Sequence, residues 1–260
     1  MGMENSEILA QYDRDERREM ILPGMRREVD GPIVRQVMEV EEEGWSYVSY
    51  SDLQEHNADE VIERQVAYFR GIDRTFEWTT YEYDTPSDLE SRLIAQAFEK
   101  EETGSLMVLE LDKAPARLLA PVTADVRRVE DVADLEVVRS LLSAVWEEDF
   151  AWFIPRMSRY LAPEGYVSIY VAYVDDAPAS AGWTFLTEGS RFAGLFGGTT
   201  LAQYRGRGLY TALLAARAQE AIGRGYQFLV IDAGEMSRPI VERQGFRVLT
   251  TTTPYVMKKP

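Results

Sequence analysis

The stretch QYRGRGLYTALLAARAQEAIGRG, residues 203–225, decides how this chain is interpreted. It opens with glycines and arginines and continues as an alanine- and leucine-rich run. The apolar residues of that run recur at helical spacing and predict one buried face: Tyr210, Leu214, Ala218 and Ala221, flanked by Leu213 and Ile222. Gly223 and Gly225 then end the helix, and the apolar stretch FLVIDA (228–233) predicts a buried strand. The helix is therefore predicted to be a crossover between two strands of a sheet.

The start of this helix is suited to binding an anion. Its unpaired N–H groups and the positive end of its dipole attract negative charge. Gly206 and Gly208 let a phosphate approach the backbone, and Arg205 and Arg207 add positive charge. A dinucleotide fingerprint would need a third glycine where Thr211 stands, and a phosphate-loop NTPase would need Gly-Lys-Ser/Thr. The alternative without a ligand is a tight turn with two solvated arginines.

Composition narrows the class of protein. The 260 residues are 45% hydrophobic, enough for a sizeable core, and the net charge is -16. This charge would repel nucleic acids and anionic membranes, so neither is expected as a partner. The sequence has no apolar run of about 18 residues, and residues 1–20 are charged where a secretion signal would be apolar. We expect a soluble, cytoplasmic protein.

The chain has no cysteine and a single histidine, His56. Disulfides, thiolate nucleophiles and cysteine-ligated zinc are therefore excluded. His56 lies in the polar connection DLQEHNADEV (52–61) and is interpreted as an ordinary surface residue. A histidine-centred triad or a multi-histidine metal site would need partners from another chain, so no metal site is predicted.

The pattern of elements indicates two α/β domains, residues 1–118 and 119–260, joined by the proline-containing segment 111–125. The first part predicts helices near 6–20, 58–72 and 87–98, alternating with strands at 44–53, 75–83 and 105–111. In the second part, the sequence predicts strands at 124–131, 167–174, 179–187, 192–201 and 227–233 and a final strand pair in 245–259. Besides the crossover helix, it predicts helices at 132–146, 150–162 and 237–244, with Pro155 breaking the second of these.

The two parts also share an internal echo. RLIAQAFEK (92–100) and IVERQGFRV (240–248) each end a helix and precede a last apolar strand, with Phe98 corresponding to Phe246. This similarity favours two related units over two unrelated domains.

The stretch RGRGLY (205–210) resembles the acyl-coenzyme A signature of the GNAT superfamily of N-acetyltransferases, (Gln/Arg)-x-x-Gly-x-(Gly/Ala), except that Tyr210 replaces the small last residue. The register QYRGRG (203–208) fits the signature fully, but the first register aligns better with the preceding strand and the following helix. The resemblance extends over residues 123–260 and includes RQGF (243–246). It implies tandem GNAT-like domains, each a mixed β-sheet flanked by helices, of which the first is a degenerate copy.

The resemblance implies acetyl-CoA, or another acyl-CoA, as co-substrate. The glycine loop would hold the pyrophosphate, and the preceding strand would line the pantetheine arm. The implied residues are Gly198, Thr199, Thr200, Leu201, Arg205, Gly206, Arg207, Gly208, Leu209, Tyr210, Thr211 and Ser237. An acceptor amine would then attack the thioester directly, in agreement with the absence of cysteine.

An alkylamine with a pKa of about 10 must first lose a proton to a base. Asp232 and Glu235, which follow the predicted strand 228–233, are the candidates, and the alternative for both is a solvated loop. WEEDFAWF (146–153) is a second candidate region for a cationic acceptor, although its aromatics are more typical of a core.

The family's acid, a tyrosine four residues before the glycine of Gly-Phe, is replaced by Val241. Ser237, Tyr210 and Tyr255 are the other candidates for the acid, and the thiolate could also leave without help. We therefore expect an N-acetyltransferase of class EC 2.3.1 that acts on a small-molecule or protein amine, with a cationic amine favoured by the acidic chain. A non-catalytic acyl-CoA-binding or sensing module is the alternative, and a different phosphate-ligand enzyme or an interaction scaffold is the third.

Overall fold

The computed structural model describes residues 3–39, 46–162 and 165–259. The chain forms two compact units, which we call unit 1 (Met1–Met107, Asp232–Pro239 and Val248–Pro260) and unit 2 (Val108–Ile231 and Ile240–Arg247). The C-terminal part of the chain thus contributes segments to both units. The domain boundary between residues 118 and 119 stays a prediction.

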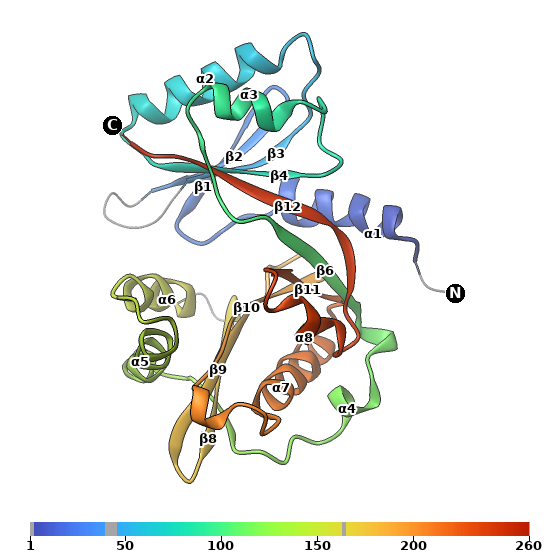
Figure 1. The fold of residues 1–260 in the computed structure, drawn as a ribbon, viewed down its shortest axis with the longest axis vertical. Helices are drawn as coiled ribbons and strands as arrows, with labels where there is room; N and C mark the ends of the chain where they lie inside the picture. The colour runs from blue at the N-terminus through green and yellow to red at the C-terminus, as the bar shows by residue number, and fades with distance from the viewer. Residues whose placement is uncertain (1–2, 40–45, 163–164, 260) are drawn as a thin grey trace. The chain divides into compact units, whose positions relative to one another are not determined.

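Unit 1 is built around strands in the order β1-β2-β3-β4-β12 (Figure 1). The strands are β1 (Met25–Asp30), β2 (Ile33–Met38), β3 (Ser46–Ser51), β4 (Phe76–Tyr81) and β12 (Arg247–Met257), with the short β5 (Glu99–Lys100) on β12. β3 and β4 are parallel and are joined by helix α2 (Ala58–Gly71), whereas β1–β2, β2–β3 and β4–β12 are antiparallel. The remaining helical elements are α1 (Asn5–Tyr12), the π-helical turn η1 (Asp13–Arg18) and α3 (Leu89–Ala95).

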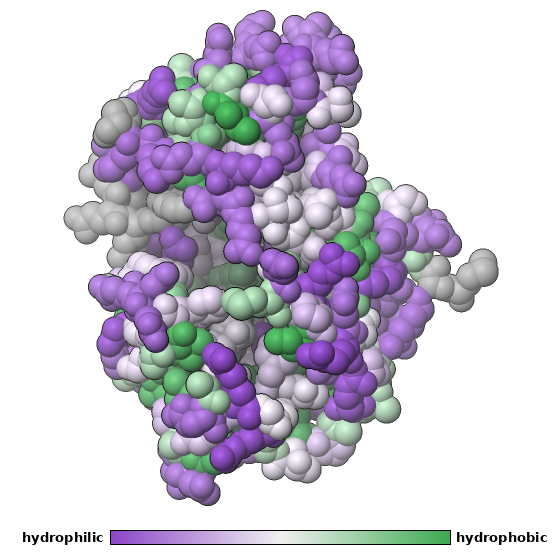
Figure 2. Space-filling model, in the orientation of Figure 1, coloured by the Kyte–Doolittle hydropathy of each residue, from purple (hydrophilic) through white to green (hydrophobic). Residues whose placement is uncertain are grey.

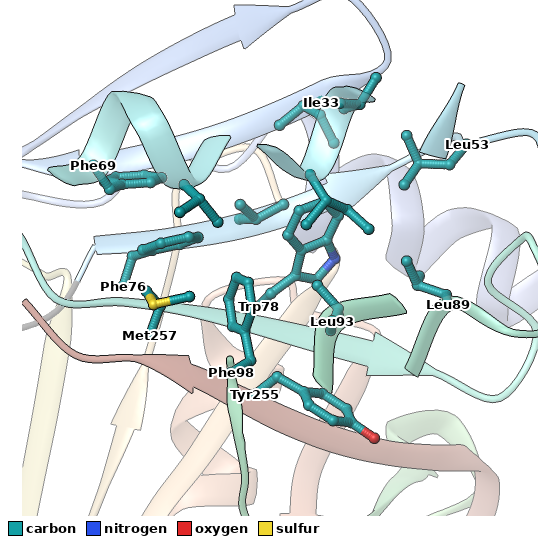
Figure 3. Packing of buried hydrophobic residues seen from close by; sticks show 14 of the residues in the cluster. Ile33, Leu53, Phe69, Phe76, Trp78, Leu89, Leu93, Phe98, Tyr255 and Met257 are labelled. Atoms are coloured by element: carbon teal, nitrogen blue, oxygen red, sulfur yellow. The ribbon is translucent and has the colours of Figure 1, made fainter. Parts of the chain in front are cut away.

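The core of unit 1 lies between this sheet and the helices α2 and α3. Figure 3 shows its aromatic centre, where Phe69 of α2 stacks on Phe76 of β4 with ring centroids 4.1 Å apart. Phe98 packs edge-on against Phe76, and Trp78 and Tyr255 are likewise buried. Aliphatic side chains such as Ile33, Ile62 and Leu93 complete this core, and burial of these apolar side chains stabilises the unit.

Unit 2 has the strand order β11-β10-β9-β8-β7. These are β7 (Val126–Arg128), β8 (Val167–Val174), β9 (Ala177–Phe185), β10 (Phe192–Thr200) and β11 (Phe228–Ala233). Figure 1 shows α5 (Leu135–Trp146) and α6 (Phe153–Leu161) on one side of β8, β9 and β10, and α7 (Leu209–Gly223) on the other. β10 and β11 are parallel and joined by α7, whereas β9–β10, β8–β9 and β7–β8 are antiparallel. The crossover predicted from residues 203–225 is therefore present.

Short elements complete the chain. They are β6 (Gly104–Glu110), η2 (Leu111–Lys113), α4 (Ala116–Leu119), η3 (Val132–Asp134), η4 (Ala202–Tyr204) and α8 (Arg238–Glu242). β6, β11, α8 and β12 each have residues in both units. Within the described residues, no helix is both long and apolar enough to cross a bilayer. On the face drawn in Figure 2, polar side chains predominate and apolar ones form small separate groups.

Several sequence-based predictions were wrong in detail. The hairpin β1–β2 was missed, and the final strand pair is a single strand, β12. Pro155 does not break a helix: α6 begins at Phe153, so the proline lies in the first turn, where its missing N–H costs no helical hydrogen bond. Ile222, expected beside the buried face of α7, is 40% exposed.

The internal echo has a matching backbone in the two units. After α3, Ala97 adopts a φ of 67°, and the Phe98 N–H donates to the Leu93 carbonyl at 3.2 Å. After α8, Gly245 adopts a φ of 103°, and the Phe246 N–H donates to the Val241 carbonyl, also at 3.2 Å. Both phenylalanines are buried. Each helix thus ends in the same left-handed cap before the chain enters a strand.

Candidate functional site

The parallel strands β10 and β11 part at the centre of unit 2. They are paired only at Phe192–Phe228, Ala193–Leu229 and Gly194–Val230. β10 continues to Thr200 without a registered partner on β11, so one edge of Leu195–Thr200 has backbone groups that β11 does not bond. Such an edge can accept an extended ligand in place of a strand.

A β-bulge distorts β10 along this open edge. Phe196 pairs with Trp183 and Thr199 with Ala181, so β10 has one residue more than β9 over this span. Gly197 has a φ of 62°, and a Cβ there would lie 1.7 Å from the Trp183 ring. A Cβ on Gly198 would lie 3.0 Å from the Tyr210 ring. The bulge is therefore held closely from both faces of the sheet by two aromatic rings, and only glycine fits at Gly197.

The polar groups of β10 are bonded on one side and free on the other. The Ser180 hydroxyl of β9 donates to the Thr199 carbonyl at 2.5 Å and lies 2.7 Å from the Thr200 hydroxyl. The Thr199 Oγ1 is buried and has no hydrogen-bond partner within the described part of the chain. Leu201 follows and borders a mainly apolar cavity of about 330 Å³, lined also by α5 and Pro178. A buried polar atom without a partner calls for a ligand or a water molecule.

The loop after β10 leads directly into α7. Gly208 is the N-cap of α7 with a φ of 78°, no side chain caps this end, and the first turn contains no acidic residue. Gly206 has a φ of 75°, and a Cβ on either glycine would meet nothing within 4 Å. There is thus open space beside both glycines at the start of this 15-residue helix, whose first N–H groups favour an anion.

The two arginines of the loop are exposed at the same end of α7. The Arg205 Nε donates to the Thr200 carbonyl at 3.2 Å, and the Arg207 guanidinium lies 5.4 Å from the centroid of the Tyr204 ring. Neither forms an ion pair among the salt bridges of the described residues. Thr211, in the first turn, accepts a hydrogen bond from Gln244 at 3.2 Å. Of the predicted cofactor residues, those at 198–201 and 205–211 therefore belong to one strand, loop and helix start, and their bound ligand stays a prediction.

Tyr210 does not simply follow the buried face of α7, as the pattern had suggested. Its half-buried ring lies against Gly198, and burial raises the pKa of its hydroxyl. Two turns further along the same helix face is Arg217, which is only 2% exposed. Arg217 was not among the residues predicted from the sequence, where its only signal is its position beside the apolar stripe of α7.

Asp232 is the last residue but one of β11 and lies in unit 1. Its carboxylate accepts a hydrogen bond from the Thr252 hydroxyl at 2.7 Å, and its Oδ1 lies 2.2 Å from where a Cβ on Gly104 would be. The side chain is accessible to solvent, yet desolvation raises the pKa of its carboxyl above the ordinary value of 3.8. An accessible carboxylate with a raised pKa is a suitable general base.

The other predicted catalytic and acid candidates differ in environment. Glu235 is exposed in the loop that follows, and the Ser237 hydroxyl donates to the Gly234 carbonyl at 3.1 Å. Val241 is fully buried in unit 2, so that position packs the core. Tyr255 is also fully buried in the core of unit 1 (Figure 3), and its hydroxyl donates to Glu90 at 2.7 Å. Tyr255 is therefore committed to the core of unit 1.

The segment 146–153 divides between core and surface. Phe153 is fully buried and packs on Trp183 with ring centroids 5.3 Å apart, as expected for a core residue. Trp146 and Trp152, in contrast, are 51% and 41% exposed. Arg156 lies over the Trp152 ring at 4.7 Å. The expectation that these aromatics form core holds for Phe153 and is wrong for the two tryptophans.

The comparisons with known proteins bear on the fold. No protein-family model matches the chain, and no curated protein matches its sequence. Among solved structures, it is similar to a GCN5-related N-acetyltransferase from Kribbella flavida, with a TM-score of 0.67 and 17% identity over 97% of this chain and 93% of that one. It is also similar to a tandem GNAT protein from the clavulanic acid biosynthesis pathway, with a TM-score of 0.60 and 15% identity over 92% and 84% of the two chains.

A third similar structure is a GCN5-related N-acetyltransferase from Sphaerobacter thermophilus, with a TM-score of 0.59 and 13% identity over 88% of this chain and 78% of that one. These likenesses extend over both units rather than residues 123–260 alone. The resemblance that residues 205–210 indicated is therefore confirmed at the level of the fold: the chain has the tandem fold of the GNAT superfamily.

Proposed function

We propose that this chain is an acyl-CoA-dependent N-acyltransferase that transfers an acetyl group from acetyl-CoA to an amine. The observation that carries the proposal is the parting of β10 from β11 after Gly194, followed by the uncapped start of α7 at Gly208. Together these features offer an open strand edge that leads to an anion-binding helix end. A long ligand with amides in the middle and a pyrophosphate at one end has the chemistry that such a path requires.

Each part of the path has a proposed role. The N–H groups at the start of α7, with Arg205 and Arg207, would bind the pyrophosphate, because they concentrate positive potential in an acidic chain. The open edge of Gly198–Leu201 would form hydrogen bonds with the pantetheine amides. Acetyl-CoA would supply the activated acyl group.

Asp232 is the proposed general base. The amine nitrogen would form a bond to the acyl carbon while the carbon–sulfur bond breaks, with its electron pair going to sulfur. Asp232 would take the proton that the amine loses. A thiolate with a pKa of about 8 to 9 can leave without an acid, so the buried Val241 does not prevent this reaction.

For the acceptor, we propose a cationic amine. Trp146 and Trp152 expose aromatic faces on either side of Glu147, Glu148 and Asp149. Aromatic rings and carboxylates together attract an ammonium group. Both a small-molecule amine and a protein amine have this chemistry.

A second candidate function is a non-catalytic acyl-CoA-binding or sensing module. The buried Val241 favours it, since the tyrosine that the resemblance implies as acid is absent. This candidate requires the same acyl-CoA path and differs only in turnover.

Thermal unfolding of the full chain with acetyl-CoA, followed by a thiol-release assay over a panel of amines, tests both candidates. Stabilisation by acetyl-CoA with thiol release supports the transferase, and stabilisation without release for any amine supports the sensor. If acetyl-CoA well above micromolar concentration does not raise the Tm, both are wrong. Desulfo-CoA serves as the control for binding that does not involve the thioester.

A further inference from the structure

Arg217 is a buried cation with no carboxylate partner. Its Nε donates to the Leu213 carbonyl at 3.2 Å, one turn earlier in α7, and its Nη1 donates to the Trp183 carbonyl at 3.3 Å in β9. Among the ion pairs of the described residues, none involves Arg217. A guanidinium keeps its proton in proteins, so unit 2 has a positive charge in its core that only backbone dipoles offset.

The guanidinium lies directly beside the bulge of β10. A Cβ on Gly182 would lie 2.9 Å from its Nη1, and Gly182 is the residue of β9 opposite the bulged Gly197 and Gly198. Tyr210, on the same face of α7, reaches Gly198 from that side. The charge therefore lies over Gly182 of β9, in the strand that neighbours the bulge of β10.

The fold itself does not require a cation at this place. Arg217 is eight residues after Leu209, the first residue of α7, and Val66 is eight residues after Ala58, the first residue of α2. Val66 is buried as an ordinary core residue of the crossover helix in unit 1. The same helical position is thus occupied by an apolar side chain in the related unit.

Other polar groups around the bulge also lack partners. Besides the Thr199 Oγ1, the Trp183 Nε1 is buried without a hydrogen bond within the described residues. Trp183 and Gly182 point to opposite faces of β9, so the unpartnered Trp183 Nε1 and the Arg217 guanidinium lie on opposite faces of the sheet beside the bulge. A group of donors that find no partner in the free protein is expected where a bound molecule brings acceptors.

We propose that Arg217 is a positioning residue that makes the bulge of β10 electrostatically positive, so that it orients and polarises the carbonyl of a bound acyl thioester. This inference rests on the proposed function. The charge would act through the backbone of Gly197 and Gly198, without contacting the co-substrate. A preorganised charge in a desolvated place stabilises negative charge more strongly than the same charge in water.

The direct test is the infrared carbonyl stretch of acetyl-CoA labelled with carbon-13 in its thioester carbonyl, bound to the full chain. This measurement needs no acceptor amine. We expect the stretch to lie at a lower frequency than in water, and to return toward the value in water in Arg217→Met. Arg217→Lys, which keeps a positive charge, should restore most of the shift. If the carbonyl stretch of acetyl-CoA bound to the unsubstituted chain lies no lower than in water, the proposal is wrong whatever the variants show.

Two further readouts separate this role from a structural one. Arg217→Met should keep or raise the Tm, because an apolar side chain replaces an unpaired buried charge. It should bind acetyl-CoA with nearly unchanged Kd and lower kcat by roughly 10- to 30-fold, the effect of a charge at this distance in a partly screened site. Arg224→Met, which removes an exposed arginine at the end of the same helix, is the matched control and should change neither kcat nor the stretch.

The outcomes distinguish the two proposals. If acetyl-CoA does not raise the Tm of the unsubstituted chain, the proposed function itself fails. If acetyl-CoA binds but Arg217→Met leaves stretch and kcat unchanged, only the role of Arg217 is refuted. Where Arg217→Met does not fold, Arg217→Gln replaces it, and an unaltered stretch in that variant would equally refute the role.

Discussion

The two units contain the same crossover and use it differently. In unit 1, β3 and β4 are parallel and joined by α2, and their described residues pair at Ser46–Phe76, Tyr47–Glu77 and Val48–Trp78. In unit 2, β10 and β11 are likewise paired over three residues and joined by α7. Both first strands contain a bulge just beyond the last pair, β3 between Val48 and Tyr50 and β10 between Phe196 and Thr199. The two units therefore share the arrangement of their backbones around the crossover and differ in the side chains placed on it.

The start of the crossover helix differs first. α7 begins after Gly208, with arginines before it and no acid in its first turn. α2 begins after Asn57 and has Asp59 and Glu60 in its first turn. These carboxylates satisfy the positive end of the α2 dipole and would repel a phosphate. His56 lies in this connection, where it is exposed, as the sequence indicated.

The gap between the parting strands differs as well. In unit 1, the Arg17 side chain from η1 enters the gap: its Nε donates to the Ser49 carbonyl at the bulge at 3.2 Å, and its guanidinium lies 3.8 Å from the centroid of the Tyr81 ring. It pairs with Asp84 at 2.9 Å and Asp13 at 2.8 Å. The chain's own arginine, neutralised by carboxylates, thus fills the place that stays open in unit 2. The two buried arginines therefore differ in their partners: carboxylates neutralise Arg17, whereas Arg217 donates to backbone carbonyls.

The largest expected effect is on unit 1. Arg17→Met leaves the buried Asp84 without its cation, which should lower the free energy of unfolding by about 3–5 kcal/mol. Urea unfolding measures this. The double variant Arg17→Met/Asp84→Asn should recover part of the loss, because only the partly exposed Asp13 is then left without its cation. If Arg17→Met is as stable as the original protein, Arg17 and Arg217 do not differ in their contribution to stability, and this prediction is wrong.

The second prediction concerns the helix start. Gly208→Glu places bulk and negative charge where the pyrophosphate is proposed, and it should weaken acetyl-CoA binding by at least about 100-fold, about 3 kcal/mol. Titration calorimetry measures the Kd. Asn57→Glu, at the corresponding cap of α2, is the matched control and should leave the Kd unchanged. Equal binding by both variants would mean that acetyl-CoA does not use the α7 start.

The third prediction tests Asp232. Asp232→Asn should lower kcat/KM by about 10²-fold, because a general base is lost. In the unsubstituted chain kcat/KM should rise with pH through a pKa above the ordinary 3.8, since burial raises the pKa of this carboxyl and only the ionised form accepts a proton. The rise of kcat/KM with pH through this pKa should be absent from Asp232→Asn.

The raised pKa of the Asp232 carboxyl favours its role as a base but lowers the stability of the folded state. A carboxyl that ionises less readily in the folded state destabilises that state increasingly as pH rises above 3.8. Asp232→Asn should therefore keep or raise the Tm at pH 7 while it loses activity. A variant with a lowered Tm and unchanged pH profile would assign Asp232 a structural role.

The smallest expected effect is a swap between the two crossover helices. Glu60 and Thr211 both occupy the third helical position, in α2 and α7. Glu60→Thr should lower the free energy of unfolding by about 0.3–1 kcal/mol, and Thr211→Glu should raise it by a similar amount. Thr211→Glu should also weaken acetyl-CoA binding several-fold, while Glu60→Thr should not. Thermal unfolding and calorimetry give the two readings.

The sequence predicted much of unit 2 because its signals are local. Apolar periodicity marks α7, and glycines mark both of its ends, so this crossover could be found from 23 residues. The hairpin β1–β2 escaped because charged residues such as Arg26 and Arg27 hide the alternation and because Arg35 and Gln36 are buried by pairing rather than by being apolar. The strand β12 was divided in two because Pro254 resembles a break, yet it lies opposite Thr79 within a continuous pairing.

The site could be predicted only as far as its motif extends. Residues 205–211 indicate a helix start. The sequence around Arg17 does not indicate that this side chain fills the gap between β3 and β4, and the sequence around Arg217 does not indicate that it is buried. Both depend on contacts between segments far apart in the chain, Arg17 with Asp84 and Arg217 with Trp183. A long charged side chain has no signature of burial in a single sequence.

The interleaving of the units has a consequence for synthesis on the ribosome. β4 of unit 1 pairs with Thr252–Met257, and Tyr255 and Met257 belong to its aromatic core. Residues 1–107 therefore emerge without the strand that covers β4 and without two of their core side chains. This unit is therefore completed only when residues 252–257 have been made, and until then the β4 edge is exposed and has to stay free of other strands.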